Sequence, residues 1–461
     1  MVNPIIPVEQ LIYKTSGERI PDLEAICVFT ALGFFLGDDT YWKNEKALLP
    51  GFSYEKGQQG NIIPGAKTFD WFYEPREISF NKVVEEFTDL FAAITRDQTK
   101  GKNVILPLSG GLDSRTQAVV LKGIQHPAVR SYSYGFKDSF KETWYGKKIA
   151  EKCGYDFLDL TIPYGYLWDV IDQLAEINQC YSDFTHPRQM AVTDELTPLG
   201  DLFYLGHWGD VLFDDMGIDE NASEEQQYQH LRHKVLKKGG PELARKLWRI
   251  WGLAGNFDQY LDDRLHNLFD AIKIKSPNAR IRAFKSLYWA PRWTSVNINV
   301  FSGIHPVALP YYDDRMCRFI CTVPEEYLAA RQVQIEYIKR QAPEIAKIPW
   351  QTFHPCNLYN YHSFGTPKYY PYRLWRKSGQ LLNEKVLGKR VIIRNWENQF
   401  LGEANQQQLA KYLFDNKAFA GFVPEAVTRS IFNAFNGKDE VFLSHPLSML
   451  LTLSVFAKKY L

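Results

Sequence analysis

The 461-residue chain has few cysteines, and they form no pattern. They show neither the paired spacing of a zinc site nor the density of a disulfide framework. A disulfide-stapled domain is therefore not expected. Free thiols in a reducing compartment, the cytoplasm, fit better. The six cysteines are Cys27, Cys153, Cys180, Cys317, Cys321 and Cys356.

Long apolar runs and net charge are also missing. No window of about 18 residues is uninterruptedly apolar, so we expect no transmembrane helix. The N-terminus lacks the basic start and cleavage site of a signal peptide. The formal net charge is +1, which gives the whole chain no attraction to nucleic acid. Hydrophobic residues make up 45% of the chain, enough for a sizeable core.

Strand-like and helix-like segments alternate from residue 103 onward. This alternation predicts an α/β fold with a doubly wound, mostly parallel sheet. An apolar face at helical spacing predicts one more helix over 79–95. The expected strands are 103–108, 128–136, 155–162 and 201–206, and the expected helices between them are 113–124, 141–154 and 166–180.

We expect three parts along the chain. Residues 1–78 are short and punctuated by Gly and Pro, with partly β character. Residues 79–365 carry the α/β pattern, and 366–461 form a helical C-terminal extension. Between Lys368 and Arg394, basic and aromatic residues alternate. That stretch suits a solvated surface best, with nucleic acid, a membrane interface or an acidic peptide as alternatives.

The segment Ser-Gly-Gly-Leu-Asp-Ser at 109–114 joins an expected strand to an expected helix. Two glycines let a ligand approach the backbone, and the unpaired amides of a helix N-terminus attract anions. Asp113 beside a phosphate could hold Mg²⁺. Alternatively, Asp113 and Ser114 simply cap the helix. The segment is neither a Walker A loop nor a G-x-G-x-x-G fingerprint.

The stretch "LSGGLDS" resembles the signature loop of N-type ATP pyrophosphatases. With these particular residues, it most resembles the loop in the synthetase domain of class B asparagine synthetases. Three later stretches are similar to further motifs of that family in the same order. The segment "ALGFFLGDDTYWKNEKALLPG" resembles the join to its glutaminase domain. The later stretches are "YSYGF" (132–136), "LGHWGDVLF" (205–213) and "LPYYDDR" (309–315).

The resemblance implies an adenine nucleotide alpha hydrolase-like fold, with ATP as substrate and Mg²⁺ as cofactor. It implies that Asp113 and Asp210 hold the metal and that Tyr134 faces the adenine. The residues that it implies for ATP and pyrophosphate binding are Leu108, Ser109, Gly110, Gly111, Asp113, Ser114, Tyr134 and Gly206.

The sequence departs from that family at several positions. Its glutaminase needs an N-terminal cysteine, whereas the first cysteine here is Cys27, so we expect ammonia, an amine, or ammonia supplied by a separate protein. His207 replaces a glutamate and acts as a base or only as a hydrogen-bonding group. The family's lysine is not matched, since Lys347 aligns poorly. Arg115 could supply phosphate-binding charge, or be a surface residue.

One more acidic position, Glu142, matches the start of a helix in the family. It is functional, or it only stabilises that helix N-terminus.

We therefore predict an ATP-dependent amide-forming ligase that adenylates a small-molecule or peptide carboxylate, or one held by a carrier protein. An intramolecular cyclase of the β-lactam or lasso-peptide type would need no added amine. Nucleotide thiolation would need a reactive thiol, with Cys153 and Cys180 as the candidates. A non-catalytic nucleotide-binding scaffold remains an alternative from another class.

Overall fold

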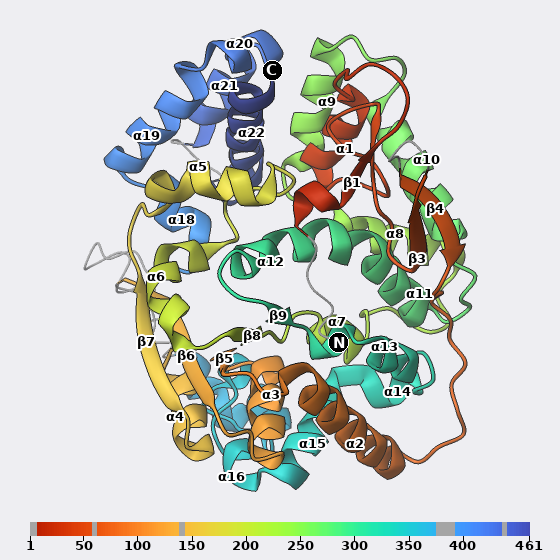
Figure 1. The fold of residues 1–461 in the computed structure, drawn as a ribbon, viewed down its shortest axis with the longest axis vertical. Coiled ribbons are helices and arrows are strands. Elements are labelled where there is room, and N and C mark those ends of the chain that lie inside the picture. Colours follow the sequence, from red (N-terminus) through yellow and green to blue (C-terminus); the bar gives the residue numbers. More distant parts are fainter. Residues whose placement is uncertain (1–6, 58–61, 138–142, 375–391, 436–439) are drawn as a thin grey trace.

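The computed structural model shows a lower part built around a sheet and an upper part that is mostly helical (Figure 1). Glu142 and most of the basic stretch from Lys368 to Arg394 fall outside the residues it describes. The described residues are 7–57, 62–137, 143–374, 392–435 and 440–461.

A five-stranded parallel sheet is the centre of the lower part. Its spatial order is β7-β6-β5-β8-β9, so β5 has later strands on both sides. Open α/β sheets bind ligands at the carboxyl ends of the strands beside such a reversal. The strands are β5 (Val104–Pro107), β6 (Val129–Phe136), β7 (Asp156–Ile162), β8 (Leu202–Tyr204) and β9 (Val307–Ala308).

Helices cover both faces of the sheet, which confirms the predicted doubly wound α/β class. On the side that is lower in Figure 1, α3 and α4 cover the sheet and α2 and α15 pack on α3, and on the other side lie α6 and α12, with α5 packed on α12. These helices are α2 (Phe80–Thr99), α3 (Leu112–Gly123), α4 (Thr143–Cys153), α5 (Leu167–Asn178), α6 (Thr193–Leu196), α12 (Ser295–Ser302), α15 (Gln332–Gln341) and the adjoining α16 (Pro343–Ala346).

Local sequence explains α2 and β5. The side chain of Ser79 accepts a hydrogen bond from the amide of Lys82 and so caps α2, which runs one turn beyond the predicted end. In β5, Val104, Ile105 and Leu106 are fully buried. Burial of each such side chain stabilises the fold by about 1.5–3 kcal/mol. The strand that leads to Ser109 is therefore anchored in the core.

The part before residue 79 contains two antiparallel strand pairs and a helix that the sequence did not predict, α1 (Leu23–Leu32). Asp22 caps α1 and Gly33, with φ of +78°, ends it. Because α1 is buried on all sides, its apolar residues show no helical period. The other elements here are η1 (Val8–Gln10), β1 (Ile12–Lys14), β2 (Glu45–Ala47), β3 (Phe52–Lys56) and β4 (Ile62–Lys67).

Between β8 and β9 the chain builds a helical layer that includes a π-helix, η4. In α11, Arg282 forms a buried ion pair with Glu325 of α14, with Nη1 2.5 Å from Oε1. Its Nε also donates to the carbonyl of Val211, which ties α7 to α11. These helices and those that follow β9 are α7 (Gly209–Leu212), α8 (Glu224–Val235), α9 (Gly240–Ile250), α10 (Phe257–Asp270), α11 (Pro277–Phe284), η4 (Lys285–Thr294), α13 (Asp314–Ile320) and α14 (Glu325–Leu328).

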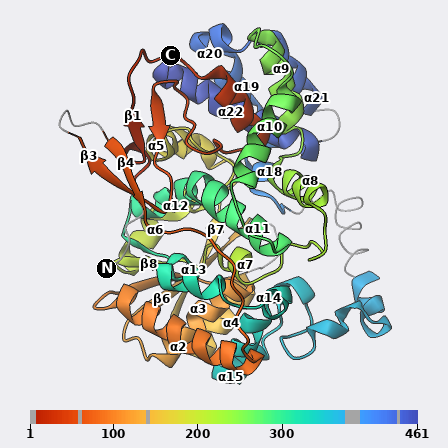
Figure 2. The same ribbon diagram turned by 90° about the vertical axis from the view of Figure 1, so that its right-hand side faces the viewer.

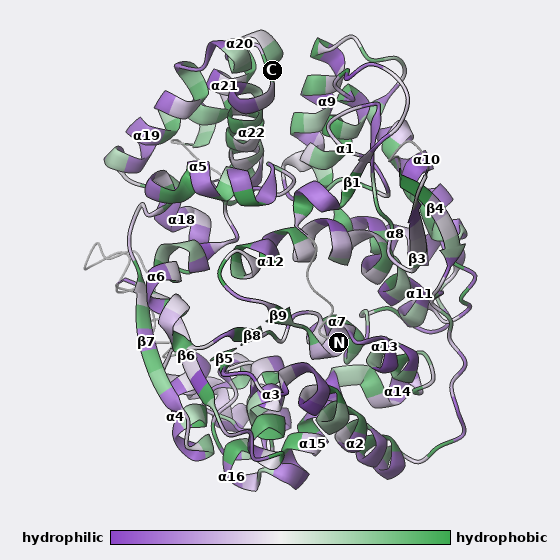
Figure 3. Cartoon of the chain, in the orientation of Figure 1, coloured by the Kyte–Doolittle hydropathy of each residue, from purple (hydrophilic) through white to green (hydrophobic). Residues whose placement is uncertain are grey.

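The last helix, α22 (Glu440–Tyr460), lies at the centre of the C-terminal helices (Figure 2). It is long and apolar enough to cross a membrane, with a mean hydropathy of 1.4, although 72% of that window is buried inside the protein (Figure 3). The sequence predicted a helical extension over 366–461 but no helix as long and apolar as this one. Around it pack α19 (Glu403–Phe414), α20 (Lys417–Phe422) and α21 (Glu425–Phe435), after α18 (Asn395–Phe400).

Short helical turns connect the longer elements. The turns are η2 (Arg188–Val192), η3 (Thr197–Leu199), η5 (Pro310–Tyr312), η6 (Ala329–Arg331), η7 (Gln351–Phe353), η8 (Tyr361–Gly365) and η9 (Pro367–Tyr369).

Candidate functional site

A cavity of about 650 Å³ opens at the carboxyl ends of β5, β6 and β8, beside the reversal of strand order. Gly110, Gly111 and Arg115 lie outside its lining. The structure thus brings together most of the residues that the sequence singled out. The predicted residues that line it are Leu108, Ser109, Asp113, Ser114, Tyr134, Gly206, His207 and Asp210.

A second hollow, of about 670 Å³, lies at the opposite edge of the sheet. Its cations already have partners: Lys122 pairs with Glu344 at 2.5 Å, and Arg130 donates to the carbonyl of Pro198. Cys153, a candidate thiol from the sequence, lines it, but none of the residues predicted to bind ATP or Mg²⁺ does, and neither do His207 and Arg115. The cavity at the carboxyl ends is therefore the candidate site.

The N-terminus of α3 carries no side-chain cap. Gly111 is the capping residue, and among the described residues there is no side-chain cap hydrogen bond at this helix start. Ser114 instead hydrogen-bonds Ser109, with 3.0 Å between the two hydroxyl oxygens and 3.0 Å from the Ser109 amide to the Ser114 hydroxyl. Neither Asp113 nor Ser114 acts as the cap. The first turn therefore keeps the positive end of the dipole and the unpaired amides that bind anions.

The two glycines of the loop serve different purposes. A Cβ on Gly110 would lie 2.5 Å from Cβ of Gln351 and 2.9 Å from the ring of Tyr145, so this position requires glycine for packing. A Cβ on Gly111 would meet only the hydroxyl of Ser109, at 3.3 Å. A side chain at Gly111 is therefore much less hindered than one at Gly110.

Asp113 and Asp210 lie in the first turns of two different helices, α3 and α7. Asp113 accepts hydrogen bonds from Arg331 and, at 3.1 Å, from Gln334. Burial raises the pKa of Asp113, Arg331 opposes that rise, and the charge of Asp210 adds to it. Asp210 lines the cavity and has no ion pair or hydrogen bond within the described ranges. Two carboxylates that line one cavity favour a cation bound there.

These donors fit Mg²⁺ bound together with a polyphosphate. Magnesium is commonly held by one or two carboxylates, with phosphate oxygens and waters completing its six ligands. Among the described residues no group of three His, Cys, Asp or Glu side chains could hold a metal alone. Asp113 and Asp210 would therefore depend on the nucleotide to complete the site.

His207 is a neutral imidazole at pH 7. Burial lowers its pKa to about 4, with Asp210 opposing that shift. Its buried Nδ1 has no hydrogen-bond partner among the described residues. The ring lines the cavity near Asp210 and can accept a proton there, although its low pKa makes it a weak base.

Arg115 does not face the cavity. Its side chain is fully buried and donates to the carbonyls of Ile348 (3.1 Å), Pro349 (3.0 Å) and Gly110 (3.4 Å). Burial lowers its pKa to about 10. The guanidinium therefore ties the segment after α16 to the loop. This geometry differs from both the surface position and the phosphate contact considered from the sequence.

Lysine reaches the cavity from another element. Lys347 lies outside the lining, whereas Lys285, the first residue of η4, lies within it. Burial lowers the pKa of Lys285 to about 8, and Asp210 opposes that shift. Its Nζ lies 5.7 Å from the ring centre of Trp208 and 5.1 Å from that of Trp289. No motif in the sequence identified this residue.

The π-helix η4 forms the wall that faces the loop at Ser109. Lys285, Trp289, Trp293 and Thr294 line the cavity from this one element. Helical turns of the π type are frequent at functional sites. Pro291 lies inside η4. In the sequence, Pro291 was the only available signal of an irregular helix here.

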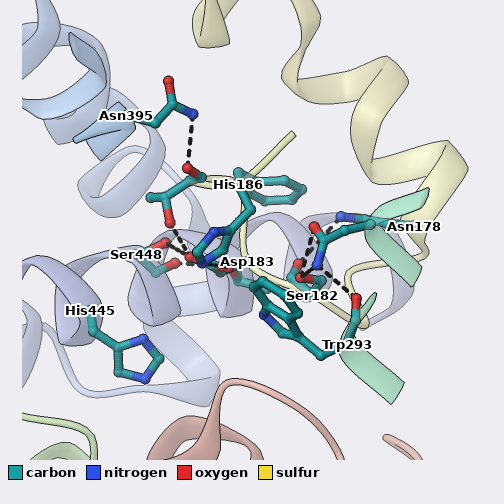
Figure 4. A network of polar contacts seen from close by, with 12 residues as sticks. Asn178, Ser182, Asp183, His186, Trp293, Asn395, His445 and Ser448 are labelled. Atoms are coloured by element: carbon teal, nitrogen blue, oxygen red, sulfur yellow. Dashed lines mark hydrogen bonds and ion pairs between the residues drawn. The ribbon is translucent and has the colours of Figure 1, made fainter. Parts of the chain in front are cut away.

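Behind this wall lies a buried polar cluster (Figure 4). The ring of His186 meets Trp293 edge to face at 4.7 Å, and its Nε2 is 3.5 Å from Oδ1 of Asp183. Ser448 of α22 donates to Asp183 at 2.8 Å. His445, also of α22, lies on the other side of the cluster (Figure 4). The C-terminal helix thus supports the cavity wall from behind.

Residues 86–193 match the family model described as Asparagine synthase. The matched range runs from α2 to the start of α6 and includes the loop at Ser109 and Tyr134. This confirms the predicted resemblance over that range. Gly206, His207 and Asp210 lie beyond it.

Two solved structures are similar to part of the chain. One is the NMN synthetase from Francisella tularensis, with a TM-score of 0.23 and 10% identity over 41% of this chain and 94% of that chain. The other is the NH3-dependent NAD synthetase from Campylobacter jejuni subsp. jejuni NCTC 11168 in complex with the nitrate ion, with a TM-score of 0.23, 14% identity and the same two coverages. No curated protein matches the sequence.

Proposed function

We propose that this chain is an ATP-dependent carbon–nitrogen ligase of the cytoplasm that joins a carboxylate to ammonia or an amine. The observation that carries the proposal is the uncapped N-terminus of α3, which shares one cavity with Asp113 and Asp210. The match to the asparagine synthase family over residues 86–193 supports ATP use and amide formation.

In the proposed reaction, a carboxylate oxygen of the substrate attacks the α-phosphorus of ATP. A new O–P bond forms, and the bond from the α-phosphorus to the bridging oxygen breaks, with its electron pair leaving on pyrophosphate. The amine then attacks the acyl carbon, the C–O bond to AMP breaks and the amine loses a proton. Amide, AMP and pyrophosphate are the products.

The chain's residues would divide these tasks. The amides at the start of α3, with Ser109 and Gly111, would bind the pyrophosphate, and Tyr134 would contact the adenine. Asp113 and Asp210 would hold Mg²⁺, which when bound neutralises charge on the phosphates. Arg331 would have to yield part of its hold on Asp113 when the metal binds.

Lys285 would supply the positive charge that the sequence left unassigned. It lines the same cavity as Asp210 and carries no ion pair within the described part of the chain. A fixed cation that lies where negative charge develops lowers the barrier more than one exposed to water. His207 would accept the proton of the attacking amine, or pass it to solvent.

The cysteines argue against glutamine hydrolysis and nucleotide thiolation. Cys27 is fully buried, and burial raises its pKa, which does not suit a glutaminase nucleophile. Burial also raises the pKa of Cys153 and of Cys180 to about 12, which leaves almost no thiolate for thiolation. Ammonia, an amine substrate or a separate ammonia-supplying protein therefore remain the proposed nitrogen sources.

ATP–pyrophosphate exchange across a panel of carboxylates tests the proposal. We expect Asp210→Asn to lower the exchange rate about 100-fold, because a metal ligand is lost. Asp172→Asn, an exposed carboxylate on α5, is the control and should leave the rate unchanged.

Exchange that survives in Asp210→Asn would contradict the assignment of the metal site. A protein that binds ATP but exchanges with no carboxylate would favour the scaffold alternative. Amide formed without added amine would identify the intramolecular cyclase instead.

A further inference from the structure

Each carboxylate of the proposed metal site already has a positive neighbour. Arg331 forms an ion pair with Asp113, and its Nε donates to Oε1 of Gln334 at 2.7 Å. Lys285 and Asp210 line the same cavity and act on each other electrostatically. Two carboxylates and two cations leave this part of the site without net charge. A divalent cation that entered alone would therefore meet no net attraction.

Arg331 reaches Asp113 from outside the cavity. Asp113 belongs to the lining, whereas Arg331 does not. Arg331 and Gln334 both donate to Oδ1 of Asp113, Gln334 at 3.1 Å. Oδ2 of Asp113 accepts from no residue within the described ranges, so it is available to a metal. The charge of the carboxylate becomes available, however, only when the guanidinium withdraws.

Asp214 offers the guanidinium of Arg331 a second counter-charge. Burial and Asp215 raise the pKa of Asp214, and Arg331 opposes that rise. The backbone of Ala330 hydrogen-bonds the Asp214 carboxylate, which holds this carboxylate beside the segment that carries Arg331. Asp214 has no ion pair within the part of the chain that the structure describes. Arg331 can therefore leave Asp113 without becoming an unpaired charge.

The backbone at Arg331 is strained. Ala330 and Arg331 have φ of +54° and +63°, so two successive residues with a Cβ adopt the left-handed conformation. They lie where η6 ends and α15 begins. Such strain persists only where surrounding contacts hold it, and it is common in segments that switch between conformations. The ion pair with Asp113 is one of the contacts that hold it here.

We propose that Arg331 is a positioning residue that supplies the counter-charge of Asp113 in the empty site and thereby makes Mg²⁺ binding depend on the nucleotide. When metal and polyphosphate enter together, Arg331 moves to Asp214 and leaves Asp113 to the metal. The proposal rests on the metal site of the function proposed above, but binding of the metal alone can be measured without any reaction.

Binding of Mn²⁺, a paramagnetic substitute for Mg²⁺, to the nucleotide-free protein tests the first half of the proposal. Arg331→Met removes the guanidinium charge, so an EPR titration should show Mn²⁺ bound about 10-fold more tightly than by wild type. The matched control is Arg340→Met, which removes an exposed arginine from the helix that follows and should leave the affinity unchanged.

A double variant locates the effect. Arg331→Met combined with Asp113→Asn should lose the gain in Mn²⁺ affinity, because the carboxylate that the first change frees is then absent. A gain that survives in the double variant would overturn the proposal. Mn²⁺ binding by Arg331→Met that equals or falls below that of wild type would overturn it too.

Unfolding by urea separates this role from a purely structural one. Without metal, Arg331→Met should unfold at a lower urea concentration than wild type, because Asp113 loses its counter-charge. Saturating Mn²⁺ should raise the midpoint of the variant more than that of wild type, since the metal then replaces the guanidinium. A deficit that Mn²⁺ does not reduce would show that Arg331 only supports the fold.

Asp214→Asn tests the second position of Arg331 and keeps the pair with Asp113. In the wild-type background it should weaken Mn²⁺ binding about 3-fold, because the displaced guanidinium then lacks a counter-charge. In the Arg331→Met background it should have no effect. Equal weakening in both backgrounds would overturn the movement to Asp214. Unchanged binding in the wild-type background would overturn it as well, and that measurement does not require Arg331→Met to fold.

ATP–pyrophosphate exchange separates this inference from the proposed function. If Mn²⁺ binding follows the stated pattern but wild type exchanges with no carboxylate, the role of Arg331 stands and the adenylation reaction fails. If wild type supports exchange and Arg331→Met binds Mn²⁺ as wild type does, the reaction stands and the role of Arg331 is wrong.

Discussion

At the scale of single residues, the loop at Ser109 separates two requirements that look the same in sequence. Gly110 is pressed against Gln351 and Tyr145, whereas a side chain on Gly111 would meet only the Ser109 hydroxyl. One glycine is needed for folding, and the other is available for ligand approach. The sequence showed only that two adjacent glycines precede a helix.

This difference predicts opposite behaviour of two alanine variants. Gly110→Ala should lower the free energy of unfolding by about 1–3 kcal/mol, because its Cβ overlaps Gln351. Gly111→Ala should lower the free energy of unfolding by less than about 1 kcal/mol, because the φ of −77° at Gly111 suits alanine. The same variant should raise the KM for ATP, because the new methyl group would crowd the pyrophosphate. Thermal unfolding and exchange kinetics measure both. A Gly111→Ala variant with wild-type KM would place the pyrophosphate elsewhere.

At the scale of secondary structure, α11 and α14 hold the short helix α7 that begins beside Asp210. Arg282 is the link, because it pairs with Glu325 and also donates to the carbonyls of Val211 and Asp214. The carboxylate partner satisfies a guanidinium that is only 2% exposed. The position of Asp210 therefore depends on an ion pair far from it in sequence.

Removal of the Glu325 carboxylate should lower the free energy of unfolding. Glu325→Ala leaves the buried guanidinium of Arg282 without its counter-charge, so we expect the free energy of unfolding to fall by about 3 kcal/mol. Glu326→Ala, at the exposed neighbouring position, should change it by less than about 0.5 kcal/mol. Urea unfolding of both variants makes the comparison. Equal stability of the two would mean that the pair contributes little.

At the scale of the whole molecule, the cluster behind Trp293 joins parts that the sequence divided into three. Asp183 lies after α5, Lys237 after α8 and His445 in α22, while the His445 ring hydrogen-bonds the carbonyl of Thr30 in α1. The N-terminal segment, the α/β part and the C-terminal helices therefore meet at one buried site (Figure 4).

This junction should make stability sensitive to acid. Burial lowers the pKa of His445 to about 4, while Asp183 opposes that shift and Lys237 and His186 add to it. At pH values between this pKa and the unfolded pKa near 6.5, the unfolded chain binds more protons than the folded protein. The free energy of unfolding therefore falls as the pH falls. His445→Gln should reduce this loss by about 2 kcal/mol between pH 7 and pH 4.5, measured by urea unfolding.

The exposed His233→Gln is the control for this prediction and should retain the wild-type pH dependence. A His445→Gln curve parallel to that of wild type would show that the imidazole is not protonated on unfolding.

The local pattern of the sequence was enough to predict the α/β class, the order of the strands along the chain and the loop at Ser109. Each of these depends on neighbours close in sequence: buried apolar runs, helical spacing and glycines before a helix start. The helix α1 was not predicted, because complete burial removes the periodicity by which a helix is recognised in a sequence.

Only the tertiary structure decided which charges share the cavity. It joined Lys285 and the indoles of η4 to the loop at Ser109 and paired Arg331 with Asp113 across 218 positions. It also placed Arg115 among backbone carbonyls. Such partners lie far apart along the chain, and packing of the whole core, not local preference, brings them together. The sequence therefore determined the nucleotide loop, whereas packing determined what lies opposite it.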